Sequence, residues 1–182
     1  MKKLYYILAV LVLVFAGCSI INPPLVDHSD TVKHYEDFVI YDFDQSGFSG
    51  FYFKADGTGE VISVSGNADL IDFWFNDRDY TAPTYMSPDG DTTVYAYPDT
   101  VDANTTYFYT ITDAEPESVM TAPDDFDDII SATVENDGWY FLLLEDGRYV
   151  KMHVTNMDTD NNWAEFEYWI QQDTTQFFGL EE

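Results

Sequence analysis

From Tyr35 onward the chain is built from short runs of aromatic and β-branched residues, broken by Asp, Gly, Asn and Pro. Such side chains suit a pleated, half-buried surface, so these runs predict strands. Eight runs fit this pattern: "DFVIYDF", "GFYFKA", "GEVISVS", "TVYAY", "TTYFYTIT", "WYFLLLE", "RYVKMHVT" and "WAEFEYWIQ". A short helix is expected only over Ala122–Ile130, where Pro123 and two aspartates stand at the start. The sequence therefore predicts an all-β fold, an antiparallel sandwich or barrel-like single domain with long loops and at most one or two short helices.

Size and charge narrow the possible partners. The chain has 182 residues, of which 46% are hydrophobic, enough for one domain with a real core. It carries 34 acidic residues against seven Lys and Arg, for a net charge of −27. A surface this acidic repels phosphate backbones, so we expect no nucleic-acid partner. Anionic lipid head groups are disfavoured for the same reason.

The N-terminus has the features of an export signal. Met1-Lys2-Lys3 is basic, and the apolar run that follows ends at Phe15, too short to span a bilayer as a mature helix. The next residues, "AGCS", resemble the lipobox of bacterial lipoproteins, a family in which the cysteine thiol takes a diacylglycerol and the peptide is cut before it. The resemblance implies lipidation of Cys18 and, because Ser19 follows it, sorting to the outer membrane. An ordinary signal peptide with an incidental cysteine is the alternative.

These features predict three parts. Residues 1–17 are expected to be a lipoprotein signal peptide. Residues 18–34, which contain Pro23-Pro24 and few apolar side chains after Val26, are expected to be a flexible tether that begins at Cys18. Residues 35–182 are expected to be the all-β domain.

Asp146-Gly147 stands between two alternating apolar runs and predicts a hairpin with a two-residue turn. Counting outward from that turn puts these pairs on one largely apolar face: Glu145 with Arg148, Leu143 with Val150, Phe141 with Met152, and Trp139 with Val154. The opposite, mixed face then carries Leu144 with Tyr149, Leu142 with Lys151, and Tyr140 with His153. We therefore expect Met152 in the core beside Phe141, and His153 beside Tyr140, both in structural roles rather than as metal ligands.

Catalytic and metal-binding patterns are weak. The single thiol and the single histidine well inside the domain leave little room for a nucleophile and its base, so we do not expect an enzyme. Zinc is not expected without a cluster of Cys and His. Asp42-x-Asp44-x-Ser46-Gly47 matches the first half of a calcium-binding loop, but Phe53 stands where a bidentate Glu is needed. Asp158-x-Asp160-x-Asn162 lacks the required Gly, so solvated Asp-rich turns are the favoured interpretation of both.

The C-terminal segments "GWYFLLLEDGRYVKMHVTNM" and "WAEFEYWIQQDTTQFF" resemble the closing strands of HmuY-like haem-binding lipoproteins. Earlier, "GFYFKADGTGEVI" resembles the aromatic strand and T-G-E-V turn of that family. "LIDFWF" resembles its W-D-x-A-F segment, with Asp72 and Phe75 matching and Ile71 in place of Trp. The resemblance covers most of Gly50 to Phe178 in the right order.

Membership in this family implies an all-β fold that captures haem for a TonB-dependent outer-membrane receptor. In characterised members, two histidines or two methionines from the stretch that is here about Asp77–Asn136 bind the iron. That stretch has no histidine, so the resemblance implies Met86 and Met120 as axial ligands, with Arg78 as a propionate partner. Two alternatives stay open: the methionines anchor loops as hydrophobes, and the lipoprotein binds a glycan or a protein, or has a structural role in the envelope.

Overall fold

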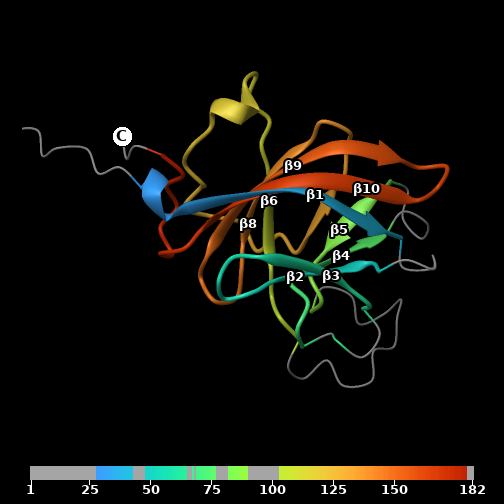
Figure 1. The fold of residues 1–182 in the computed structure, drawn as a ribbon. Helices are drawn as coiled ribbons and strands as arrows, with labels where there is room; N and C mark the ends of the chain where they lie inside the picture. Colours follow the sequence, from blue (N-terminus) through green and yellow to red (C-terminus); the bar gives the residue numbers. More distant parts are fainter. Residues whose placement is uncertain are drawn as a thin grey trace, which may run out of the picture.

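The strands form two five-stranded antiparallel sheets packed face to face, in a computed structural model that describes residues 28–42, 48–64, 67, 69–76, 82–89 and 103–179 (Figure 1). The first sheet has the order β1-β10-β9-β8-β6 and the second the order β3-β2-β4-β5-β7. The elements are η1 (Ser29–Thr31), β1 (Val32–Tyr41), β2 (Gly50–Phe53), β3 (Gly59–Ile62), β4 (Phe73–Asn76), β5 (Thr84–Met86), β6 (Tyr107–Thr110), η3 (Pro116–Ser118), β7 (Ser131–Thr133), β8 (Trp139–Leu143), β9 (Tyr149–Asp158) and β10 (Trp163–Gln171). The predicted all-β sandwich is confirmed.

The main core lies between the sheets and follows from the alternation of side chains along each strand. In β10, residues Ala164, Phe166, Tyr168 and Ile170 all belong to this core and are fully buried. The residues between them face outward and are only half-buried. In the second sheet, Phe73 of β4 packs edge to face with Tyr85 of the neighbouring strand β5 and, across the interior, with Phe166 of β10. This aromatic layer fixes which side of each strand remains available to a ligand.

The β8–β9 hairpin differs from the prediction by one residue. Gly147 N–H donates to the Leu144 carbonyl and Leu144 N–H to the Arg148 carbonyl, so three residues rather than two form the loop. Gly147 takes a φ of +85°, as the last residue of such a three-residue loop requires. The register consequently pairs Tyr140 with Met152 and Trp139 with His153.

Relative to the predicted register, this shift of one residue exchanges the two faces of β8 against those of β9. Met152 is buried in the core as predicted, but its neighbour is Tyr140 and not Phe141. His153 lies on the outer face, stacked on Trp139 at 4.1 Å between ring centroids, and not beside Tyr140. Phe141 packs outside the sheet, in a separate cluster with Phe126 and Phe178.

Two further expectations are corrected. The domain begins before residue 35, because β1 starts at Val32 and His28 N–H already bonds to the Gly179 carbonyl. Ala122–Ile130 is not helical. Asp127 and Asp128 both have positive φ angles (50° and 53°), which a right-handed helix cannot include, and Asp127 N–H donates to Asp125 Oδ1 at 2.8 Å in a turn. Among the described residues, no helix is long and apolar enough to cross a bilayer.

Candidate functional site

A cavity of about 320 Å³ opens at the end of the sandwich where several loops meet. The β2–β3 and β8–β9 turns and the segments that lead into β4 and β6 all contribute to it. Its lining residues are Tyr52, Phe53, Ala55, Asp72, Asn104, Glu145, Asp146 and Arg148. We call it the loop-end pocket. Loops clustered on a rigid sandwich are a common place for binding sites, and the volume lies at the lower end of the range for small-molecule pockets.

Asp72 lies at the base of the loop-end pocket, 7% exposed, just before β4. Its Oδ2 accepts a hydrogen bond of 2.7 Å from Phe53 N–H. Burial raises the pKa of this carboxyl to about 7, although the Phe53 hydrogen bond acts in the opposite direction. Near neutral pH the group therefore exists in both forms, and its protonated form can donate as well as accept.

Arg148 lies opposite and is 8% exposed. Its Nε donates to Asp146 Oδ2 at 2.7 Å, its Nη1 to the Lys54 carbonyl at 2.9 Å and its Nη2 to the Phe53 carbonyl at 3.1 Å. The Phe53 residue thus bonds Asp72 through its amide and Arg148 through its carbonyl. This shared anchor holds an acid and a cation at fixed positions at the end of the main core.

The rim of the loop-end pocket adds further polar groups. Asn104 Nδ2 donates to the Leu70 and Ile71 carbonyls, which fixes its side chain ahead of β6. Glu145 Oε2 accepts from Thr105 N–H at 3.2 Å. Half-buried Tyr52 supplies an aromatic surface. Acceptors, donors and one ring therefore converge on a small space, lined by the carboxyl groups of Asp72, Glu145 and Asp146 and the guanidinium of Arg148.

The structure does not bring Met86 and Met120 together. Met86 lies in β5, not in a loop, and is 5% exposed among Trp74, Ile71 and Val64 on the outer face of the second sheet. Met120 is 46% exposed and lines a groove on the outer face of the first sheet. The whole sandwich separates their sulfurs, so they cannot bind one iron. The expected bis-methionine site is not formed, because two apolar outer faces, and not two facing loops, hold these residues.

The remaining predicted residues divide into two groups. Cys18 and Arg78, the predicted lipidation site and propionate partner, lie outside the described residues, as do Asp44, Ser46 and Gly47 of the first calcium-like loop. Asp158 Oδ1 accepts from Asp160 N–H and Asn161 N–H, both at 3.0 Å, which is the pattern of a self-capped turn. Within the described ranges, no group of three or more His, Cys, Asp or Glu side chains is placed to hold a metal ion.

Comparison with known proteins finds similarity at the level of the fold. No family model matches the chain, and no curated protein matches it. A solved structure of a DUF4466 family protein from Parabacteroides merdae superposes with a TM-score of 0.56 at 7% sequence identity. The match covers 77% of this chain and 53% of that protein, so this chain spans about half of its length. At this identity the likeness supports the sandwich fold alone.

Sequence reasoning missed the loop-end pocket, although two signals pointed toward it. Asp72 is an acid inside the apolar run "LIDFWF", where burial of an unpaired charge is costly. Arg148 is one of only two arginines in the chain and follows a turn of two acids and a glycine. The sequence does not show that these segments, 76 positions apart, share the Phe53 backbone as a partner.

Proposed function

We propose that this protein is a lipid-anchored lipoprotein of the cell envelope whose β-sandwich binds a short, neutral, hydroxyl-rich ligand, a glycan, in the loop-end pocket. The observation that carries the proposal is that buried Asp72 and buried Arg148 line one cavity of about 320 Å³ and are both held by the Phe53 backbone. A sugar hydroxyl donates and accepts at once, so it suits a site in which an acid and a guanidinium stand close together.

Charge selects among possible ligands. Glu145 and Asp146 flank Arg148 at the pocket, and the whole chain has a net charge of −27. An anionic ligand would approach against this field, whereas a neutral one is not repelled. Asn104 adds a side-chain amide, and the ring of Tyr52 offers an apolar surface for the C–H face of a sugar ring.

Haem capture has less support. The two methionines lie on opposite outer faces, and haem carries two propionates that the acidic loop-end pocket would repel. The groove that contains Met120 has a volume of about 210 Å³, below the usual range even for pockets of drug-sized ligands. Delivery of haem to a TonB-dependent receptor is therefore not the function we favour.

The proposal of a lipid anchor is based on the lipobox-like residues around Cys18. Multiple acyl chains on the mature N-terminus would hold the domain at the membrane, where one chain would be marginal. The first described element, η1, begins at Ser29, which leaves about ten residues between the anchor and the sandwich. Mass spectrometry of the purified protein should find an acylated Cys18 as its N-terminal residue, and an unmodified thiol would contradict the placement.

The binding test uses the full chain in phosphatidylcholine nanodiscs on an array of neutral, uronic-acid, sulfated and amine-bearing glycans. We expect neutral glycans to bind and acidic ones to be rejected. Asn104→Ala and Tyr52→Ala should each weaken binding at least tenfold without unfolding the domain, while Asp124→Asn, an exposed acid on another loop, should leave it unchanged. Binding of none of the neutral glycans, or binding only of amine-bearing ones, would contradict the proposal.

A further inference from the structure

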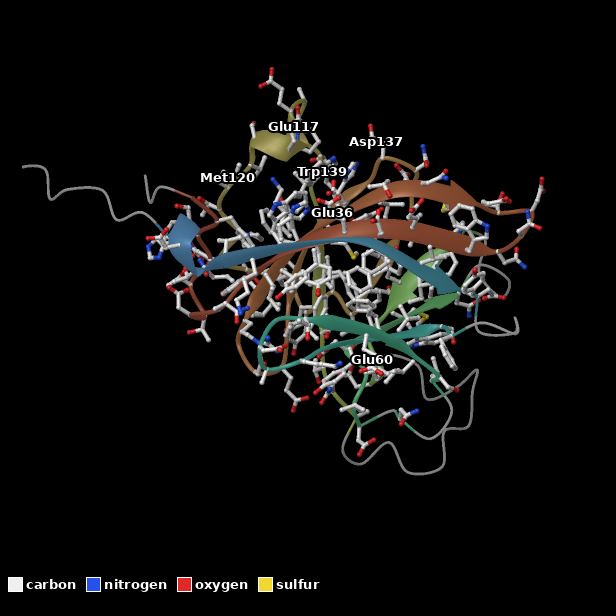
Figure 2. The ribbon with its side chains drawn as sticks, in the orientation of Figure 1. Glu36, Glu60, Glu117, Met120, Asp137 and Trp139 are labelled. Carbon is white, nitrogen blue, oxygen red and sulfur yellow. The ribbon has the colours of Figure 1, made fainter. Side chains whose placement is uncertain are left out.

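A second cavity, of about 210 Å³, lies on the outer face of the first sheet. Trp139, Lys151 and Trp169 come from the adjacent strands β8, β9 and β10. Glu117 and Met120 come from the η3 segment, and Phe178 from the C-terminal segment. Figure 2 shows Glu117 and Met120 on the segment that stands above the sheet, over the face that carries Trp139. We call this cavity the tryptophan groove.

The two tryptophans form a fixed aromatic wall. Their rings lie nearly parallel, 5.6 Å apart at 17°. His153 stacks on Trp139, and His34 stacks on Trp169 at 4.3 Å and 3°. Glu167 bonds both imidazoles, at 2.9 Å to His153 and 2.8 Å to His34. Burial alone would raise the pKa of Glu167, but these hydrogen bonds outweigh it and lower that pKa. The rings are therefore held by neighbours on three strands before any ligand arrives.

Lys151 provides the one cation of the groove. It is 3% exposed, and its Nζ donates to the Glu117 carbonyl at 2.7 Å and the Val119 carbonyl at 2.8 Å. The same Nζ lies 4.7 Å from the Trp139 ring centroid. No carboxylate forms a salt bridge with Lys151 among the described residues. An ammonium has three donors, so the two main-chain carbonyls leave one N–H for a ligand, and the Glu117 carboxylate acts on the charge without a salt bridge. Burial lowers the pKa of Lys151 to about 8.

We propose that the tryptophan groove binds a small apolar monocarboxylate, with its carboxylate on Lys151 Nζ and its apolar body against Trp139, Met120 and Phe178. A ligand carboxylate would form the direct ion pair that Lys151 lacks among the described residues. The apolar lining selects a hydrocarbon or single-ring body, and the volume restricts it to a small one. The nearby Glu117 carboxylate disfavours a second negative charge, which selects a monoanion. This site is separate from the loop-end pocket and does not depend on glycan binding.

The probe is phenylacetate, with its neutral analogue phenylacetamide as a matched control, added to the full chain in phosphatidylcholine nanodiscs. Chemical shifts of selectively labelled methionine methyl groups report the site, because Met120 lines the groove while Met152 and Met86 are buried elsewhere. We expect a saturable shift of the Met120 methyl signal with phenylacetate and binding at least tenfold weaker with phenylacetamide.

Two substitutions should change the affinity for phenylacetate in opposite directions. Lys151→Gln should weaken binding at least tenfold, whereas Glu117→Gln should strengthen it. Loss of structure would weaken binding in both variants and would not produce this difference. Lys54→Gln, which changes an exposed lysine, should have no effect. If Lys151→Gln fails to fold, phenylacetate binding is measured as a function of pH instead. Binding to the wild-type protein should fall between pH 7 and 9.5 as Lys151 loses its proton. In Lys151→Arg, binding should persist over the same range.

Three results would overturn the proposal. The first is equal affinity for the acid and the amide. The second is a Met120 signal that phenylacetate leaves unshifted at millimolar concentration. The third is binding that survives Lys151→Gln or does not change up to pH 9.5.

Discussion

At the residue scale, the fold changes the chemistry of Asp72 strongly. Its carboxyl is buried with the Phe53 amide as its hydrogen-bond donor, and its pKa is about 7 in the folded chain, against an ordinary value near 3.8. A buried acid that titrates near neutrality is common at functional sites. The protonation of Asp72 therefore changes the charge at the base of the loop-end pocket.

This raised pKa predicts how stability depends on pH. The folded state holds the Asp72 proton more tightly than the unfolded state does, so its contribution is present below pH 4 and is lost as the pH rises through 7. Asp72→Asn keeps an acceptor for Phe53 N–H and removes the titration. Urea unfolding should therefore show that the free energy of unfolding of the variant rises relative to that of the wild type between pH 4 and 8, by on the order of 2–4 kcal/mol.

Asp124→Asn, at an exposed position, is the matched control. Its free energy of unfolding should differ from that of the wild type by the same amount at every pH. An Asp72→Asn curve that also stays parallel would show that Asp72 is ionised in the folded chain across this range.

At the element scale, most strands can be predicted from the sequence, but their register cannot. Aromatic and β-branched runs located β2, β8, β9 and β10, because alternation is a local property. The three-residue strands β5 and β7 were missed because they are too short to show a period. The extra loop residue shifts the register, so the residues of β8 face the opposite way from the prediction and His153 pairs with Trp139 instead of Tyr140. The tryptophan groove was missed for the same reason, since the predicted register put Lys151 and Trp139 on opposite faces.

The three-residue loop itself gives a second prediction. A side chain at Gly147 would meet only Thr174 Cγ2, at 3.8 Å, so space is not limiting there. Its φ of +85° is costly for other residues. Gly147→Ala should therefore lower the free energy of unfolding by about 1–2 kcal/mol.

Gly147→Asn should cost less than Gly147→Ala, because Asn tolerates the left-handed region better. Urea denaturation of the two variants measures the difference. If alanine cost no more than asparagine, the loop would not have the positive φ on which the register depends.

At the scale of the whole molecule, the sandwich has a ligand-sized cavity at its loop end and another on the outer face of its first sheet. Between the sheets, Phe51 packs edge to face with Phe166 and Tyr168 in the main core. This core separates Met86 from Met120. The sequence could suggest these two methionines, but only the arrangement of the sheets shows that they face away from each other.

A haem titration tests this separation. Under reducing and oxidising conditions, we expect no six-coordinate low-spin spectrum that depends on both Met86 and Met120. Met86→Ala should instead lower stability by about 2–5 kcal/mol as a truncation of a buried side chain, while Met120→Ala, at an exposed site, should change it little. A spectrum lost in each single variant would contradict the placement of these residues.

Binding of a neutral glycan against Asp72 and Arg148 in the loop-end pocket should change the environment of the Arg148 guanidinium. The arginine Nε–H signals of the isotope-labelled full chain report this change during titration with the tightest-binding neutral glycan of the array. The chain has two arginines, so each signal can be assigned by one substitution. We predict that the Arg148 signal shifts and saturates with the binding curve. An unmoved Arg148 signal at saturating glycan would contradict it.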